Sequence, residues 1–165
     1  MNLNLQLDQV AEHIRDLIWD QLATELQLVS CQQGCPEQLR TLDDLAQEVP
    51  AVLLDPPRWA GARPDDSLPA VEGTVTIHLS YLRRIQAGEE HPRATVTRLS
   101  RLASLFLTPD FSLSGWDNST GFAVERIWPS DVQHEHDLTY EDAAVRIALG
   151  TVTLQATCIA YLPAG

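Results

Sequence analysis

The sequence predicts an α+β fold in which two main helices pack on one face of a bent, antiparallel β-sheet. Three observations carry this prediction: helical spacing of apolar residues over residues 8–28, strict alternation over residues 73–82, and a run of strands after residue 110. The intervals between the predicted strands are too irregular for a doubly wound parallel sheet. A chain of 165 residues is expected to form a single domain, residues 1–165, around one core.

Residues 8–28 are predicted to form an amphipathic helix, because apolar residues recur at spacings of three and four. The apolar face consists of Val10, Ile14, Leu17, Ile18 and Leu22. Gly34 and Pro36 break the chain after this helix, and a shorter helix is expected over residues 37–48. The apolar run at residues 51–54 is bounded by prolines on both sides, which is typical of a buried strand.

Residues 56–69 are predicted to form a mobile surface loop. The segment contains four prolines, together with glycine, arginine and aspartate, and such a composition disfavours regular structure. Trp59 is the exception within it. Its large aromatic ring either packs into the domain or awaits a partner.

Residues 73–82 give the clearest strand prediction, because apolar and polar residues alternate with a period of two. One face of this strand is expected in the core, and the other, which is rich in threonine, is expected in solvent. The next helix is expected to begin at Pro92 and to end before Pro109. It carries arginines at positions 93, 98 and 101.

The last third of the chain is predicted to be mostly strand. Residues 122–128 form one strand, which Pro129 ends, and residues 129–143 form a polar, acidic hairpin. Residues 144–159 form a long final strand in which the apolar positions change from odd to even numbers at Gly150. Such a change of phase indicates a β-bulge or sharp bend at this glycine.

Charge and composition exclude several classes of function. All eleven basic residues are arginine, so Schiff-base lysines, P-loop lysines and lysine general bases are excluded. The net charge of −12 argues against duplex DNA or an anionic membrane as the main partner, since both need a basic face. Neither a secretory signal nor an apolar run long enough to span a membrane is evident.

The three cysteines are Cys31, Cys35 and Cys158. An odd number without a visible signal peptide favours free thiols in a reducing compartment. Cys31 and Cys35 have no histidine close to them in sequence, so a zinc site there is disfavoured. Cys158 stands in an alternating apolar stretch and is expected to be buried.

His134 and His136 form the most suggestive chemical motif. On a strand both side chains would face the same side, as in an H-x-H metal pair, and His78 could join them if its strand were a neighbour. Solvated residues of an extended hairpin would look the same. The chain contains no G-x-S-x-G, G-x-G-x-x-G or H-E-x-x-H motif, so neither a catalytic set nor a cofactor is expected.

The order of elements resembles the tail terminator or tail completion proteins of tailed bacteriophages and prophages, including the Mu-like group. The most similar pieces are the V-P-A-V-L-L strand at residues 49–54, after a leucine-rich helix, and the R-x-x-R-L-x-x-L pattern at residues 98–105. The resemblance covers nearly the whole chain as an arrangement of elements, whereas neither piece is specific alone.

This resemblance implies a structural virion protein and not an enzyme. Such proteins form homo-hexameric rings, closed through sheet edges, that cap the tail tube and join it to the head connector, first in the host cytoplasm and then in the tail and neck of the virion. The loops at residues 56–69 and 131–140 would grip the tube or the connector. The candidate assembly residues are Arg58, Trp59, Arg63, Arg98, Arg101, His134 and His136. No membrane or specific nucleic-acid binding is implied, and the acidic chain would suit a channel through which DNA slides.

Two alternatives remain beside the tail terminator. The chain could be another head–tail connector or minor tail protein with a related fold. It could also be a small cytoplasmic metal-dependent enzyme or ligand-binding domain that uses His78, His134 and His136.

Overall fold

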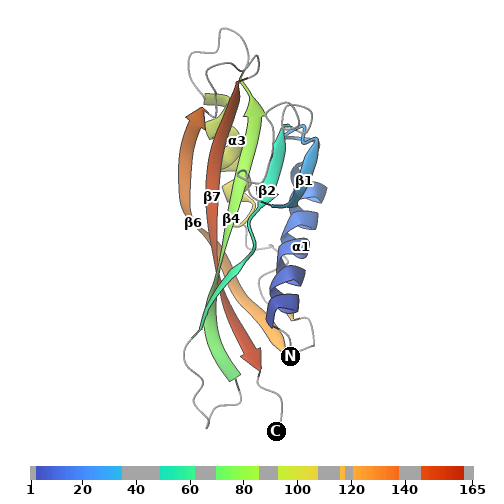
Figure 1. The fold of residues 1–165 in the computed structure, drawn as a ribbon, viewed down its shortest axis with the longest axis vertical. Helices are drawn as coiled ribbons and strands as arrows, with labels where there is room; N and C mark the ends of the chain where they lie inside the picture. The colour runs from blue at the N-terminus through green and yellow to red at the C-terminus, as the bar shows by residue number, and fades with distance from the viewer. Residues whose placement is uncertain are drawn as a thin grey trace.

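The fold is built on three long strands, seen in a computed structural model that describes residues 3–34, 49–61, 70–85, 93–107, 116–117, 121–137 and 146–161. In chain order the elements are α1 (Leu3–Leu22), β1 (Ser30–Gln33), β2 (Ala51–Leu54), β3 (Arg58–Gly61), β4 (Ala70–Arg84), α3 (Arg93–Ser104), β5 (Trp116–Asp117), β6 (Phe122–Asp137) and β7 (Ile147–Tyr161). The long strands β4, β7 and β6 lie side by side and twist along their length (Figure 1).

The strands form one sheet in the order β1-β2-β4-β7-β6-β5, with β3 also paired to β4. All the described pairs are antiparallel except β1 with β2, which is parallel. The predicted α+β class is therefore confirmed, and β1 adds one parallel pair to the expected antiparallel sheet.

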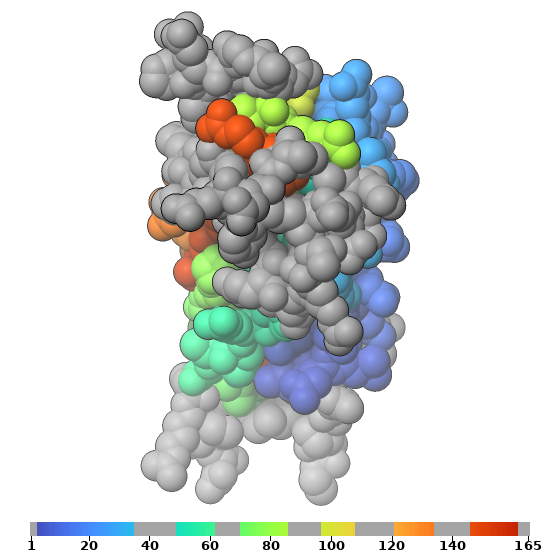
Figure 2. Space-filling model, turned by 45° about the horizontal axis from the view of Figure 1, so that its top comes forward, coloured from blue at the N-terminus to red at the C-terminus, as the bar shows by residue number. Residues whose placement is uncertain are grey.

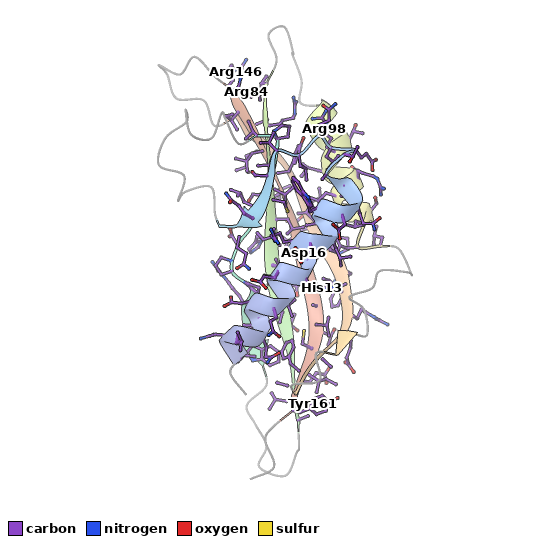
Figure 3. The ribbon with its side chains drawn as sticks, turned by 90° about the vertical axis from the view of Figure 1, so that its right-hand side faces the viewer. His13, Asp16, Arg84, Arg98, Arg146 and Tyr161 are labelled. Atoms are coloured by element: carbon purple, nitrogen blue, oxygen red, sulfur yellow. The ribbon has the colours of Figure 1, made fainter. Side chains whose placement is uncertain are left out.

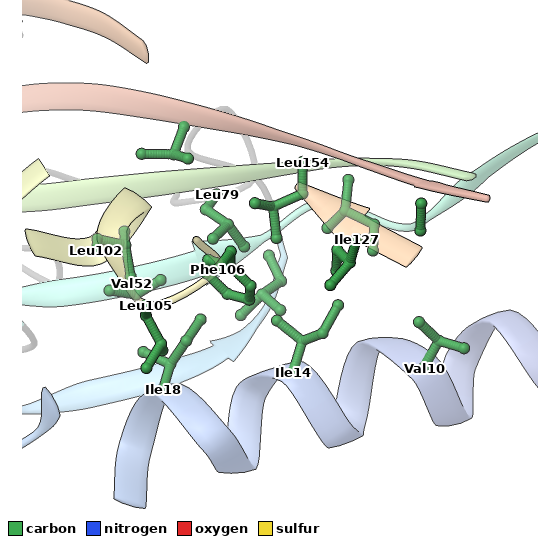
Figure 4. Packing of buried hydrophobic residues seen from close by; sticks show 14 of the residues in the cluster. Val10, Ile14, Ile18, Val52, Leu79, Leu102, Leu105, Phe106, Ile127 and Leu154 are labelled. Carbon is green, nitrogen blue, oxygen red and sulfur yellow. The ribbon is translucent and has the colours of Figure 1, made fainter. Parts of the chain in front are cut away.

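The two described helices, α1 and α3, contribute to the main core on one face of the sheet. Alternate residues of β4 and β7 point into this core and meet Ile14 and Ile18 of α1 and Leu102 of α3 (Figure 4). These three side chains have no exposed surface. Burying a side chain of this kind stabilises the fold by about 1.5–3 kcal/mol. The residues buried between the helices and the sheet are those that the helical and period-two patterns of the sequence predict to be buried.

The first helix is shifted toward the N-terminus relative to the predicted residues 8–28. It includes Leu3 and Leu7, which continue the apolar stripe and pack against the core. It ends at Leu22, and a turn with Gln27 at a φ of 53° leads the chain into β1. The outward side of α1 forms part of the molecular surface (blue in Figure 2). The helix predicted over residues 37–48 lies outside the described residues.

Two segments predicted to be irregular are strands. Residues 58–61 of the predicted loop form β3, which pairs with residues 73–76 of β4. Pro129 does not end its strand, because β6 continues to Asp137, eight residues beyond the proline. The pairing of β6 with β7 shifts register before the proline, between Val124 and Arg126, and again directly after it, between Pro129 and Asp131. These shifts let the strand continue past a residue that has no backbone N–H to donate. An edge strand tolerates proline in this way.

The predicted bulge at Gly150 is also wrong. The pairing of β7 with β4 runs without a shift from Ile147 to Tyr161, with Gly150 opposite Tyr81. The register shift lies instead on β6, between Gln133 and His136. The odd-numbered apolar residues Ile147 and Leu149 belong to a second, smaller cluster on the other face of the sheet, and this cluster explains the change of phase.

The second cluster joins the ends of three strands. It consists of Val49, Ala51, Leu53, Leu82 and Ile147, with Leu149 packed against it. This end of the sheet is therefore apolar on both faces, whereas the rest of β7 alternates strictly between buried and half-buried residues.

Gly150 is required by the close approach of α3. A Cβ atom at this position would lie 2.2 Å from Cδ1 of Leu99 and 2.9 Å from its Cγ. Leu99 is itself fully buried, so it has little room to move away. The glycine lets the helix sit directly on the sheet.

We predict that Gly150→Ala lowers the free energy of unfolding by about 1–3 kcal/mol, because the added methyl group overpacks the helix–sheet contact. Urea unfolding followed by circular dichroism would measure the loss. In a Leu99→Ala background the same glycine substitution should cost clearly less, since the overlapping atoms are gone. Equal costs in the two backgrounds would contradict the proposed contact.

Candidate functional site

The outer edge of β6 is a long edge of the sheet. On its inner side β6 pairs with β7 over most of its length. On its outer side, within the part of the chain that the structure describes, only β5 pairs with it, at Ala123 and Val124. From Arg126 to Asp137 the backbone thus presents an edge without a described strand partner. Such an edge is a template on which another chain can add a strand.

Trp59 anchors β3 to the domain. Its indole ring covers Gly73 so closely that a Cβ there would lie 2.4 Å from the ring, and it covers Gly61 at 2.5 Å. The ring centroid lies 6.0 Å from that of Phe122, with the ring planes tilted by 55°, a favourable aromatic geometry. Of the two predicted roles for Trp59, the structure shows packing into the domain. Arg58 beside it is exposed, and Arg63 lies outside the described residues.

We predict that intact protein resists trypsin at Arg58, because a paired strand cannot enter a protease active site. Trp59→Ala should release β3 and raise the rate of cleavage after Arg58 at least several-fold, as measured by mass spectrometry of the fragments. Trp19→Ala, which removes an exposed tryptophan from α1, is the matched control and should leave the rate unchanged. Rapid cleavage at Arg58 in the unsubstituted protein would show that Trp59 does not hold the strand.

Beyond the second apolar cluster, the sheet face opposite α1 and α3 is polar. Thr74, Thr76 and His78 of β4 stand across from Thr157, Gln155 and Thr153 of β7. The Nδ1 atom of His78 lies 3.0 Å from Oγ1 of Thr153, which is a hydrogen bond between the two strands. The predicted threonine-rich face is thus present, and on it His78 bonds to a threonine.

The strand register separates the backbones of His78 and His136, two of the three histidines considered for a metal site. His78 is aligned with Thr153 of β7, whereas His136 is aligned with Leu149. Because β4 and β6 flank β7, the two backbones are separated by about 10 Å across the sheet and about 13 Å along it. The side chains of His134 and His136 are not among those described. Among the described side chains no group of three or more potential metal ligands occurs.

The two described arginine side chains of α3 make different contacts. Arg101 Nε donates to both carboxylate oxygens of Glu25, at 2.9 and 3.0 Å, and so ties α3 to the turn after α1. Both partners are about half exposed, so the pair adds little stability. Arg98 Nη1 donates to the hydroxyl of Tyr81 at 3.0 Å. Burial raises the pKa of Tyr81, and the hydrogen bond from Arg98 opposes that rise.

A set of arginines at one end of the sheet was not predicted as a site. Arg83 and Arg84 end β4, and Arg146 directly precedes β7. The Ile85 amide donates to the Arg146 carbonyl at 2.9 Å, so these strand ends are neighbours, and Figure 3 shows Arg84 and Arg146 together with Arg98 below them. The sequence signal was the arginine pair at the end of a period-two strand, but only the pairing of β4 with β7 adds Arg146.

The described cysteines are structural. Cys31 and Cys158 are buried, as predicted for Cys158, and burial raises the pKa of each thiol to about 12. A thiol with this pKa is almost entirely protonated at neutral pH, which makes it a poor nucleophile and metal ligand.

Comparison with known proteins adds no assignment. No protein family model matches the chain, and no curated protein matches its sequence. Among the described helices, none combines the length and the apolar character needed to cross a membrane. The observations that bear on the function of the protein are therefore its α+β fold and the outer edge of β6.

Proposed function

We propose that the protein is a structural component of a bacteriophage tail, a tail terminator that caps the tail tube as a closed homo-hexameric ring and joins it to the head connector. The observation that carries this proposal is the long outer edge of β6, where residues 126–137 have no described partner strand. An edge of this length is suited to strand pairing between copies. The order of elements, which resembles that of tail terminators, supports the same reading.

A ring requires two different surfaces on each copy. The sheet offers them, because β6 lies toward one end of the strand order and β1 at the other, with α1 beside β1 (Figure 1). If the β6 edge of one copy pairs at the β1 side of the next, the contact is heterologous and can close into a ring. The net charge of −12 also suits a channel wall that repels DNA phosphates.

The ring can be tested by cross-linking its two proposed edges. Gln32 on β1 and Gln133 on β6 are both exposed, and cysteine at both positions, in a Cys35→Ser background, provides sites for a short bis-maleimide. We expect a ladder of covalent species that ends at six times the chain mass of 18.3 kDa. The control places the second cysteine at exposed Glu72 on β4 and should remain monomeric. A ladder that stops at the dimer would contradict a heterologous ring.

The role in the tail can be tested by deleting the gene from the phage or prophage that encodes it. Without a cap, polymerisation of the tail tube should continue past its normal length, and heads should remain separate from tails in electron micrographs. Expression of the protein from a plasmid should restore normal tails. Tails of normal length joined to heads in the deletion strain would overturn the proposed function.

A further inference from the structure

The outward side of α1 carries two large apolar side chains. Leu5 is 52% exposed and Trp19 is 43% exposed. Glu12 stands midway between them in the sequence, and residues spaced by seven share one line of a helix because seven residues make almost two turns. The buried residues of α1, such as Ile14, are on the opposite side, so this line faces away from the sheet, in front of which α1 lies in Figure 3.

Carboxylates flank this line along its whole length. Four exposed ones follow one another at intervals of four residues, namely Asp8, Glu12, Asp16 and Asp20. Arg15, the one arginine of α1, pairs with Asp16 at 2.6 Å. Among the described residues, neither Asp8 nor Asp20 takes part in an ion pair. Together with Leu5 and Trp19, the four carboxylates form a negatively charged surface, the α1 outer face.

The chemistry of this face favours a partner that is both apolar and basic. Aromatic anchors surrounded by polar groups are typical of protein interfaces, and an indole ring also attracts cations. Leu5 and Trp19 are about 21 Å apart along the helix axis. A second helix can match a line of this length, because two helices pack along an apolar seam with charged residues on both sides of it.

The described helices of a second copy do not fit this face. Another α1 would bring carboxylates against carboxylates, which repel one another. Two arginines of α3 are already engaged within the chain: Arg98 donates to the hydroxyl of Tyr81, and Arg101 donates to Glu25. The complementary charge is therefore expected on a different protein.

We propose that the α1 outer face binds a basic, amphipathic helix of another protein. The partner helix lies along α1, with its apolar residues against Leu5 and Trp19 and its arginine or lysine side chains against the flanking carboxylates. The contact uses no residue of β1 or β6, so it stands or falls separately from the proposed ring.

A synthetic helical peptide of about 18 residues tests this contact. Its leucines occupy one face at spacings of three and four, and arginines occupy the rest. A scrambled peptide of the same composition has no apolar face and controls for net charge. In fluorescence anisotropy at low salt, the protein should bind the amphipathic peptide at least tenfold more tightly than the scrambled one. Equal binding would overturn the proposal, because net charge alone would then explain it.

Substitutions on α1 locate the bound peptide. Leu5→Gln with Trp19→Gln removes the apolar anchors and should weaken binding at least tenfold. Glu12→Gln with Asp20→Asn removes two carboxylates, and should weaken binding at least threefold and lower its dependence on salt. A folded double variant that binds the peptide as tightly as the unsubstituted protein would overturn the proposed contact.

Matched controls change the same residue types elsewhere on the surface. Leu107→Gln replaces a leucine that is 66% exposed, and Glu72→Gln replaces an exposed carboxylate on β4. Both should leave peptide binding unchanged. Circular dichroism and thermal melting would show that every variant is folded.

Sedimentation velocity of the protein alone tests a second copy as the occupant. Self-association that disappears in the variant without Leu5 and Trp19 would assign the α1 outer face to a contact between copies and overturn the proposal. Self-association that is unchanged in this variant, together with lost peptide binding, would support a partner of a different kind.

Discussion

The unbroken pairing of β4 with β7 is the constraint on which the rest of the structure depends. Fifteen residue pairs, from Ala70 with Tyr161 to Arg84 with Ile147, keep one register. This register places Val75, Ile77 and Leu79 on the face that α1 and α3 cover. It also fixes Gly150 under Leu99 and thereby sets how closely α3 approaches the sheet. A slip of one residue would turn every side chain of the pair to the opposite face.

Much of the fold could be predicted because its signals are local. Alternation in residues 73–82 and helical spacing around Ile14 report directly which face of each element is buried. The phase change at Gly150 misled the prediction, because a bulge and a second apolar cluster on the other face leave the same pattern. Pro129 misled it as well, because a proline signals a strand end unless the strand lies at the edge of a sheet.

The candidate interaction surfaces were less predictable because they depend on which strands become neighbours. The acidic spacing on α1 is visible in the sequence, and so is the arginine pair that ends β4. Arg146 is separated from that pair by more than sixty residues and joins it only through strand pairing. Likewise, only the strand order shows that His78 and His136 stand on strands at opposite sides of β7.

The position of β7 in the chain has a consequence for how the protein matures during synthesis. β7 follows every other described strand, yet it stands between β4 and β6 in the sheet. Until these residues have been synthesised, the two-residue strand β5 is the one described partner that β6 has, and long-range pairing such as that of β7 with β4 forms slowly. The ordered outer edge of β6 therefore comes into existence last. A chain without β7 would lack the long strand that holds β6 in the sheet.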